Sequence, residues 1–150
     1  MISEHEVIRH FVDYTLQQTT TREIPLWYVG YYSEISDPTF RKYMKGIRLP
    51  APVKLIMIAE LFECTVNELL GFEPVDVRPR DHLFDSGRDT RVVHRYFADQ
   101  IMKYSEGIAL PDSMTNALKE YIRYCKLPDT TTLLTICDSL MCTPSELLGY

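Results

Sequence analysis

The sequence repeats itself after 78 residues, and this repetition constrains the fold more than any other feature. Residues 40–72 align with residues 118–150 without a gap, and 11 of the 33 aligned pairs are identical. Roughly two identities are expected from ordinary composition. In the first copy the identical residues are Tyr43, Leu49, Pro50, Leu55, Ile58, Cys64, Thr65, Glu68, Leu69, Leu70 and Gly71. We therefore expect two copies of one small module.

The repeat predicts two domains, although a length of 150 residues would allow one. We expect a first module over residues 1–72, a linker over residues 73–89 and a second module over residues 90–150. Two prolines and a glycine interrupt any periodic pattern in the linker. Because its arginines alternate with aspartates, the segment is more typical of a solvated connector than of a basic patch.

Apolar residues recur at helical spacing along both modules, which predicts an all-α fold. Ser3, Thr65 and Thr143 each precede a Glu by three residues, as in the capping boxes that open helices. The expected helices of the first module cover residues 4–18, 25–32, 37–45, 52–63 and 66–70. Those expected at the start of the second cover residues 90–105 and 114–124. We expect five-helix modules.

The front half of the second module is predicted to be shortened. Residues 90–113 do not match the first copy at the same offset, although Tyr104-Ser105-Glu106 echoes Tyr32-Ser33-Glu34 at an offset of 72. We therefore expect a shortened or fused helix pair, followed by a longer loop over residues 107–113.

Composition and spacing favour a cytoplasmic protein that is not an enzyme. No apolar run approaches the ~18 residues of a membrane span, and the N-terminus has no signal-peptide pattern. The four cysteines form no C-x-x-C pair, and no histidine lies near them at zinc spacing. No nucleophile, paired-carboxylate or phosphate-loop motif stands out. We expect reduced cysteines, and no metal, cofactor or membrane partner. The net charge of −5 also argues against nucleic acid, but its distribution is uneven.

The segment Ile24–Pro50 has the spacing of a helix, a tight turn with one apolar residue, a second helix and a glycine-proline exit. The residues that carry this pattern are Gly30 where the helices would cross, Ile35 in the turn, Phe40 and Tyr43 on the buried side, and Gly46 and Pro50 at the exit. The segment resembles the Cro/lambda-repressor-like (XRE-type) family of helix-turn-helix DNA-binding domains. The resemblance covers residues 4–72 and 114–150 well, and residues 90–113 in part.

The resemblance implies a transcriptional regulator that places residues 37–46 in the major groove of double-stranded DNA. Five positive charges and no acid lie between Arg41 and Lys54, which suits phosphate neutralisation and guanine reading. By family position, Asp37, Pro38, Arg41 and Lys42 would face bases, and Lys45 and Arg48 would lie nearer phosphates. The complete set of candidate DNA-binding residues is Asp37, Pro38, Thr39, Arg41, Lys42, Lys45 and Arg48, with Lys119, Arg123 and Lys126 in the second copy.

Other features favour a helix-turn-helix-shaped module that binds a protein and not DNA. The family commonly has a phosphate-anchoring glutamine at the position of Leu26, and Asp37 would face an electronegative groove. In the second copy, Glu120 replaces Lys42 and Tyr124 replaces Gly46. The partner would be another regulator or polymerase. A third interpretation, that the charges form only a solvated helix face, also stays open.

A run of four aromatic residues in Trp27–Tyr32 exceeds what one short helix can bury against a small module. Either the first helix or the second module covers these side chains, or they form a surface for another protein. For the second case, the candidate interface residues are Trp27, Tyr28 and Tyr31, and the candidate partner is a second copy of the chain or another protein.

Overall fold

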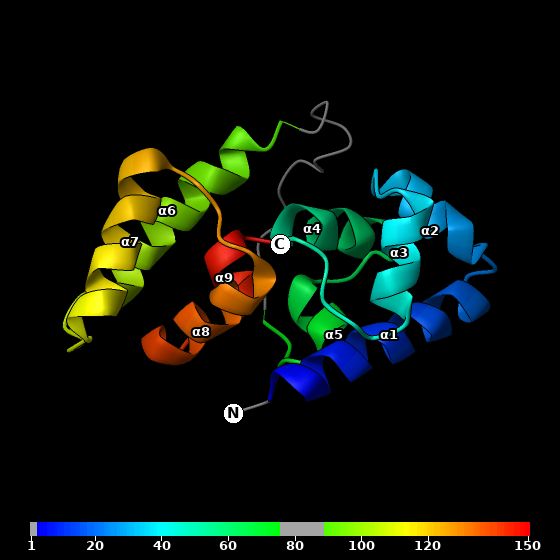
Figure 1. Ribbon diagram of the computed structural model, residues 1–150, viewed down its shortest axis with the longest axis horizontal. Coiled ribbons are helices and arrows are strands. Elements are labelled where there is room, and N and C mark those ends of the chain that lie inside the picture. The colour runs from blue at the N-terminus through cyan, green and yellow to red at the C-terminus, as the bar shows by residue number, and fades with distance from the viewer. Residues whose placement is uncertain (1–2, 76–88) are drawn as a thin grey trace. The chain divides into compact units, whose positions relative to one another are not determined.

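All regular secondary structure in the described residues, 3–75 and 89–150 of the computed structural model, is α-helical (Figure 1). The chain divides into two units, Met1–Val75 and Asp76–Tyr150. The first unit contains α1 (Glu4–Thr21), α2 (Leu26–Tyr32), α3 (Asp37–Met44), α4 (Pro52–Leu61) and α5 (Val66–Leu70). The second contains α6 (Arg91–Ser105), α7 (Asp112–Tyr124), α8 (Thr130–Leu140) and α9 (Pro144–Leu148). The expected all-α fold class is confirmed.

The core of the first unit forms around α4, whose sequence is apolar on most of its circumference. Residues 55–59 of this helix are all buried. On one side α4 contacts α2, and on another it contacts α5, which also packs against α1 (Figure 1). Helix α1 contributes Val7 and Phe11 to this core, both fully buried. Helix α3 contacts α2 and buries Phe40 and Tyr43, so its other face is left for solvent.

In the second unit α6 is the helix against which the others assemble. It contacts α7, α8 and α9, and α8 also contacts α9. Its buried residues are Val93, Phe97, Ala98 and Ile101, which lie on one helical stripe. The amphipathic α7 buries Leu118 and leaves most of its surface exposed.

The second unit has four helices, not five, in its described residues, so a tandem pair of five-helix modules is not confirmed. Helices α8 and α9 correspond to α4 and α5 at the offset of 78. Helix α6 packs on α9 as α1 packs on α5, which makes α6 the counterpart of α1. In that pairing Tyr104 takes the place of Tyr14, an offset of 90. The difference between the two offsets is twelve residues, about the length of α2 with its turn.

The echo of Tyr32-Ser33-Glu34 in Tyr104-Ser105-Glu106 does not reflect equivalent positions, because the former triplet ends α2 and the latter ends the counterpart of α1. Burial of an apolar stripe against the last helix, and not the identity of these three residues, decides which helices correspond.

The helix ends follow the predicted signals in part. Helix α1 continues to Thr21, past the expected end at residue 18, and α7 begins at Asp112, inside the loop expected over residues 107–113. Thr65 Oγ1 accepts a hydrogen bond from the Glu68 N–H at 3.1 Å, and Thr143 and Glu146 form a complete capping box. Ser36 lies at the N-cap of α3 as expected, but its hydroxyl donates to Thr39 Oγ1 at 2.9 Å and not to the helix backbone. Pro25 is the N-cap of α2 and not its first residue. Of the predicted linker, residues 76–88 lie outside the described residues.

Candidate nucleic-acid interface

Helices α2 and α3 cross at very short range, at the glycine that the sequence marked for this role. A Cβ atom on Gly30 would lie 3.2 Å from Phe40 Cγ, closer than side chains normally approach. Ile35 lies buried in the turn between the helices, and its N–H donates to the Gly30 carbonyl at 2.9 Å. The expected roles of Gly30 and Ile35 are therefore confirmed. The close approach at Gly30 and the buried Ile35 pack α2 and α3 directly against each other.

Two features of this turn were not predicted. Glu34 has a φ of 57°, in the left-handed region that non-glycine residues rarely adopt. Lys54 of α4 donates from Nζ to the Glu34 carbonyl at 3.1 Å. The Lys54 ammonium group thus forms a hydrogen bond with the turn and connects the turn to α4. This contact gives Lys54 a structural role in place of the freely available charge that the sequence indicated.

The structure brings the first-copy candidates together on the outward face of α3 and the loop that follows. Phe40 and Tyr43 point into the core, so the remaining positions of the helix face away from it. Thr39 is half-buried, and the exposed candidates are Asp37, Pro38, Arg41, Lys42, Lys45 and Arg48. Helix α3 ends at Met44, and Gly46 follows with a φ of 75°, which confirms the expected glycine stop.

One carboxylate moderates the positive charge of this face. Asp37 Oδ2 and Arg41 Nη2 form an ion pair at 2.8 Å, one helical turn apart. The aspartate also lies in the first turn of α3, where the helix dipole favours a negative charge. Exposed pairs of this kind are weak, about 0–1 kcal/mol, so the guanidinium can exchange the aspartate for another acceptor.

The other cations of the α3 face, Lys42, Lys45 and Arg48, are not paired with a carboxylate in the described residues. The Arg48 guanidinium lies over the Tyr43 ring, with 5.6 Å between its central carbon and the ring centroid. Within the described part of the chain, Lys42 and Lys45 have no acidic partner. A net positive charge therefore remains on the α3 face after the Asp37–Arg41 pair is taken into account.

The aromatic residues of α2 form a separate exposed surface, which we call the α2 aromatic surface and define as Trp27, Tyr28 and Tyr31. Trp27 is 64% exposed and Tyr31 is 73% exposed, whereas Tyr28 is half-buried. The Trp27 ring meets Tyr28 edge-on, with 5.8 Å between the ring centroids. The helix carries no charged residue. The idea that α1 covers Trp27 and Tyr31 is therefore wrong.

The candidates of the second unit lie on α7 and just after it, and they are more strongly engaged by their own neighbours. Lys126 Nζ lies 3.9 Å from Glu120 Oε2 and 5.5 Å from the centroid of the Tyr121 ring. The Arg123 guanidinium lies over the Tyr124 ring at 5.4 Å. Lys119 is exposed.

The end of α7 also differs from the end of α3. With Tyr124 in place of Gly46, α7 continues through Tyr124, and Cys125 takes the left-handed conformation at a φ of 46°. The second unit also lacks a short helix before α7 that would match α2 in the described residues. The helix-turn-helix geometry of the first unit is thus not repeated around Lys119, Arg123 and Lys126.

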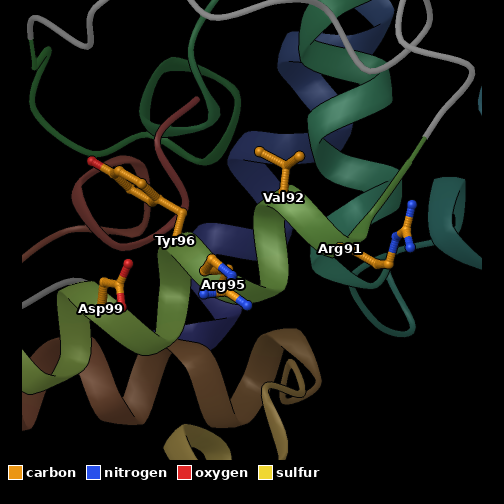
Figure 2. A pocket seen from close by; sticks show the side chains of 5 residues that line it. All are labelled: Arg91, Val92, Arg95, Tyr96 and Asp99. Carbon is orange, nitrogen blue, oxygen red and sulfur yellow. The ribbon is translucent and has the colours of Figure 1, made fainter.

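A shallow hollow lies on the outer face of α6, opposite the buried stripe of that helix (Figure 2). The described residues that line it are Arg91, Val92, Arg95, Tyr96 and Asp99. Arg91 is paired with Asp89 at 2.8 Å, and this pairing lowers the pKa of Asp89 to about 2. These five residues all belong to α6.

In residues 3–75 and 89–150, no group of three His, Cys, Asp or Glu side chains could hold a metal ion. No helix in the same residues is long and apolar enough to cross a membrane. The chain matches no family model, no curated protein and no solved structure.

Proposed function

We propose that this protein is a sequence-specific, double-stranded DNA-binding transcriptional regulator of the XRE helix-turn-helix type, which inserts α3 into the major groove. The observation that carries the proposal is the fixed crossing of α2 and α3 at Gly30 and Phe40, which presents a convex, cationic helix face to solvent. A helix held in this way fits a groove about 12 Å wide.

The roles of the individual side chains follow from their positions on α3. Lys42 lies in mid-helix with an exposed side chain and would contact base edges, where a lysine pairs best with guanine. Arg41 would join it after leaving Asp37, which could then accept from a cytosine amino group. Lys45 and Arg48 lie at the end of the helix and in its exit loop, where they would contact phosphates.

The second unit would contribute less to base reading. Its cations lie over tyrosine rings or beside Glu120, and no counterpart of α2 supports α7. We assign to Lys119, Arg123 and Lys126 phosphate contacts at most. Two modules in tandem, or a dimer, would meet half-sites roughly 34 Å apart.

The test is a fluorescence anisotropy titration of genomic fragments at low salt. The variant changes Lys42, Lys45 and Arg48 to alanine together. A matched control changes three exposed cations elsewhere, Arg9, Arg95 and Lys103, so that the net charge falls equally. The proposal predicts that the first variant loses binding and the control keeps it. Equal affinity of the two variants would show that α3 does not bind the DNA.

A second candidate function, protein binding, is favoured by the α2 aromatic surface. Trp27 and Tyr31 are both more than half exposed and lie on one helix without charged residues, which is typical of a protein-binding surface. The partner would be a second copy of the chain or another regulator or polymerase. Sedimentation equilibrium of the protein and of a W27A/Y31A variant tests the first of these: a dimer that becomes a monomer supports it, and a monomer in both cases excludes it. If no fragment binds even at low salt, protein binding becomes the primary proposal.

A further inference from the structure

The carboxyl end of α8 closes with a turn that brings two cysteines together. Met141 has a left-handed φ of 53°, and the Cys142 N–H donates to the Cys137 carbonyl at 3.0 Å. This is the hydrogen bond of a Schellman motif, in which the side chains of the two bonded residues commonly touch. Here these side chains are thiols, and their interaction raises the pKa of the Cys137 thiol.

The two thiols differ in their access to solvent. Cys137 is 2% exposed and faces the core, whereas Cys142 is half-buried. Both are free thiols in the structure. A small oxidant approaching from solvent would therefore meet Cys142 first, and Cys137 would be the only thiol in contact behind it.

The first unit contains the same turn with one thiol. Glu63 has a left-handed φ of 55°, and the Cys64 N–H donates to the Ala59 carbonyl at 3.0 Å. Cys64 is thus equivalent to Cys142, and Ala59 to Cys137. The backbone arrangement belongs to the repeat, but the pair of thiols belongs to the second unit alone.

We propose that Cys137 and Cys142 are a modification site, which a peroxide oxidises to an intramolecular disulfide and a thiol reductant reopens. The Cys142 thiolate attacks one peroxide oxygen, the O–O bond breaks, and Cys142 becomes a sulfenic acid. The Cys137 sulfur then attacks the Cys142 sulfur: the S–S bond forms, the S–H bond of Cys137 and the S–O bond of Cys142 break, and the released proton and hydroxide leave as water. Overall, two thiols and one hydrogen peroxide give one disulfide and two waters.

The surroundings agree with this order of events. The hydrogen bond with Cys142 and burial raise the pKa of the Cys137 thiol, and the nearby carboxylate of Glu146 acts in the same direction. Cys137 therefore stays protonated and does not react with peroxide by itself. It reacts once the adjacent sulfur has become electrophilic, because the contact replaces a bimolecular encounter.

Tryptic mapping of the full-length protein tests the proposal. Residues 127–150 contain no Lys or Arg, so both cysteines remain in one peptide, separate from Cys125 and Cys64. After peroxide treatment and alkylation without reduction, this peptide should carry no alkyl group and be lighter by about two mass units, for the two hydrogens lost. A thiol reductant should restore two alkylation sites. Alkylation of both cysteines after peroxide, or a disulfide to Cys125, would overturn the proposal.

Two substitutions exchange the residues found at the equivalent positions 59 and 137 of the two units, so that each unit serves as a control for the other. C137A reproduces the residue found at Ala59 and should leave Cys142 oxidised only to acids, with no loss of two hydrogens. A59C installs the second thiol in the first unit and should create a new internal disulfide in the tryptic peptide 55–80, because Pro79 blocks cleavage after Arg78. If A59C forms none while the native pair does, the shared turn geometry is not what makes the pair reactive.

Discussion

Gly71 allows a direct measurement of how the last helix of the first unit is fixed against α1. The residue ends α5 at a left-handed φ of 85°, and a Cβ atom there would lie 2.7 Å from His10 Cγ. His10 in turn donates from Nε2 to the Glu68 carbonyl at 3.0 Å. A G71A substitution therefore strains the backbone and also displaces the imidazole from its hydrogen bond.

Gly46 provides the matched control, because it has a similar left-handed φ of 75° but more space. A Cβ atom on Gly46 would meet only Ile8 Cγ2, at an ordinary 3.7 Å. G46A should lower the free energy of unfolding by the backbone cost alone, roughly 1–2 kcal/mol. G71A adds the lost hydrogen bond, about 0.5–1.5 kcal/mol, so its total cost should be about 1.5–3.5 kcal/mol.

Urea unfolding of the full chain, followed by the fluorescence of its single tryptophan, measures both variants. Trp27 lies in the first unit, so the signal reports on that unit. Measured against an H10A variant, G71A should cost no more than G46A does in the parent, since no ring is left to displace. If G71A and G46A cost the same, or if the excess persists without the imidazole, the inferred contact between α5 and α1 is wrong.

Three further predictions concern single side chains. The Ser33 hydroxyl is buried without a hydrogen-bond partner among the described residues, so S33A should raise the free energy of unfolding by about 1 kcal/mol in the same urea assay. Asp129 caps α8 by accepting from the Thr132 N–H at 2.7 Å, and this bond lowers the pKa of Asp129. D129A should lower the free energy of unfolding by about 1 kcal/mol at neutral pH, as measured by thermal unfolding. This difference between the variant and the parent should shrink as the pH falls below 3.8, because the Asp129 carboxylate of the parent then becomes protonated and no longer caps the helix as an anion. Burial raises the pKa of the Cys64 thiol from 9.0 to about 11. Because the thiol of the unfolded chain ionises at the lower pH, the free energy of unfolding of the first unit should fall as the pH rises from 9.0 to about 11. In C64A this fall should be smaller.

The repeat made the scaffold half of each unit predictable, because identical core and capping residues require the same packing. Thr65 and Thr143 open their helices as expected, and Gly71 and Gly149 end them with φ values of 85° and 81°. The correspondence of α6 with α1 was missed. It depends on an apolar stripe and one shared tyrosine, Tyr14 with Tyr104, and such stripes are common to most amphipathic helices.

The candidate site was predictable as a set of residues but not as a set of interactions. Periodicity places Phe40 inside and Lys42 outside, and both positions are as expected. The Asp37–Arg41 pair depends on rotamers of exposed side chains, and the left-handed Glu34 depends on how two helices meet. The contact of Cys137 with Cys142 required the turn at Met141, which no local sequence preference signals, since methionine rarely adopts that conformation.

The most direct test of the central claim is the salt dependence of DNA binding when the assigned phosphate contacts are removed. The slope of log affinity against log salt changes by about 0.9 for each phosphate contact. A K45A/R48A variant should therefore bind its fragment with a slope smaller by roughly 2 and with the same sequence preference, whereas K42A should change that preference. An unchanged slope in K45A/R48A, with an unchanged preference in K42A, would contradict the placement of α3 in the major groove.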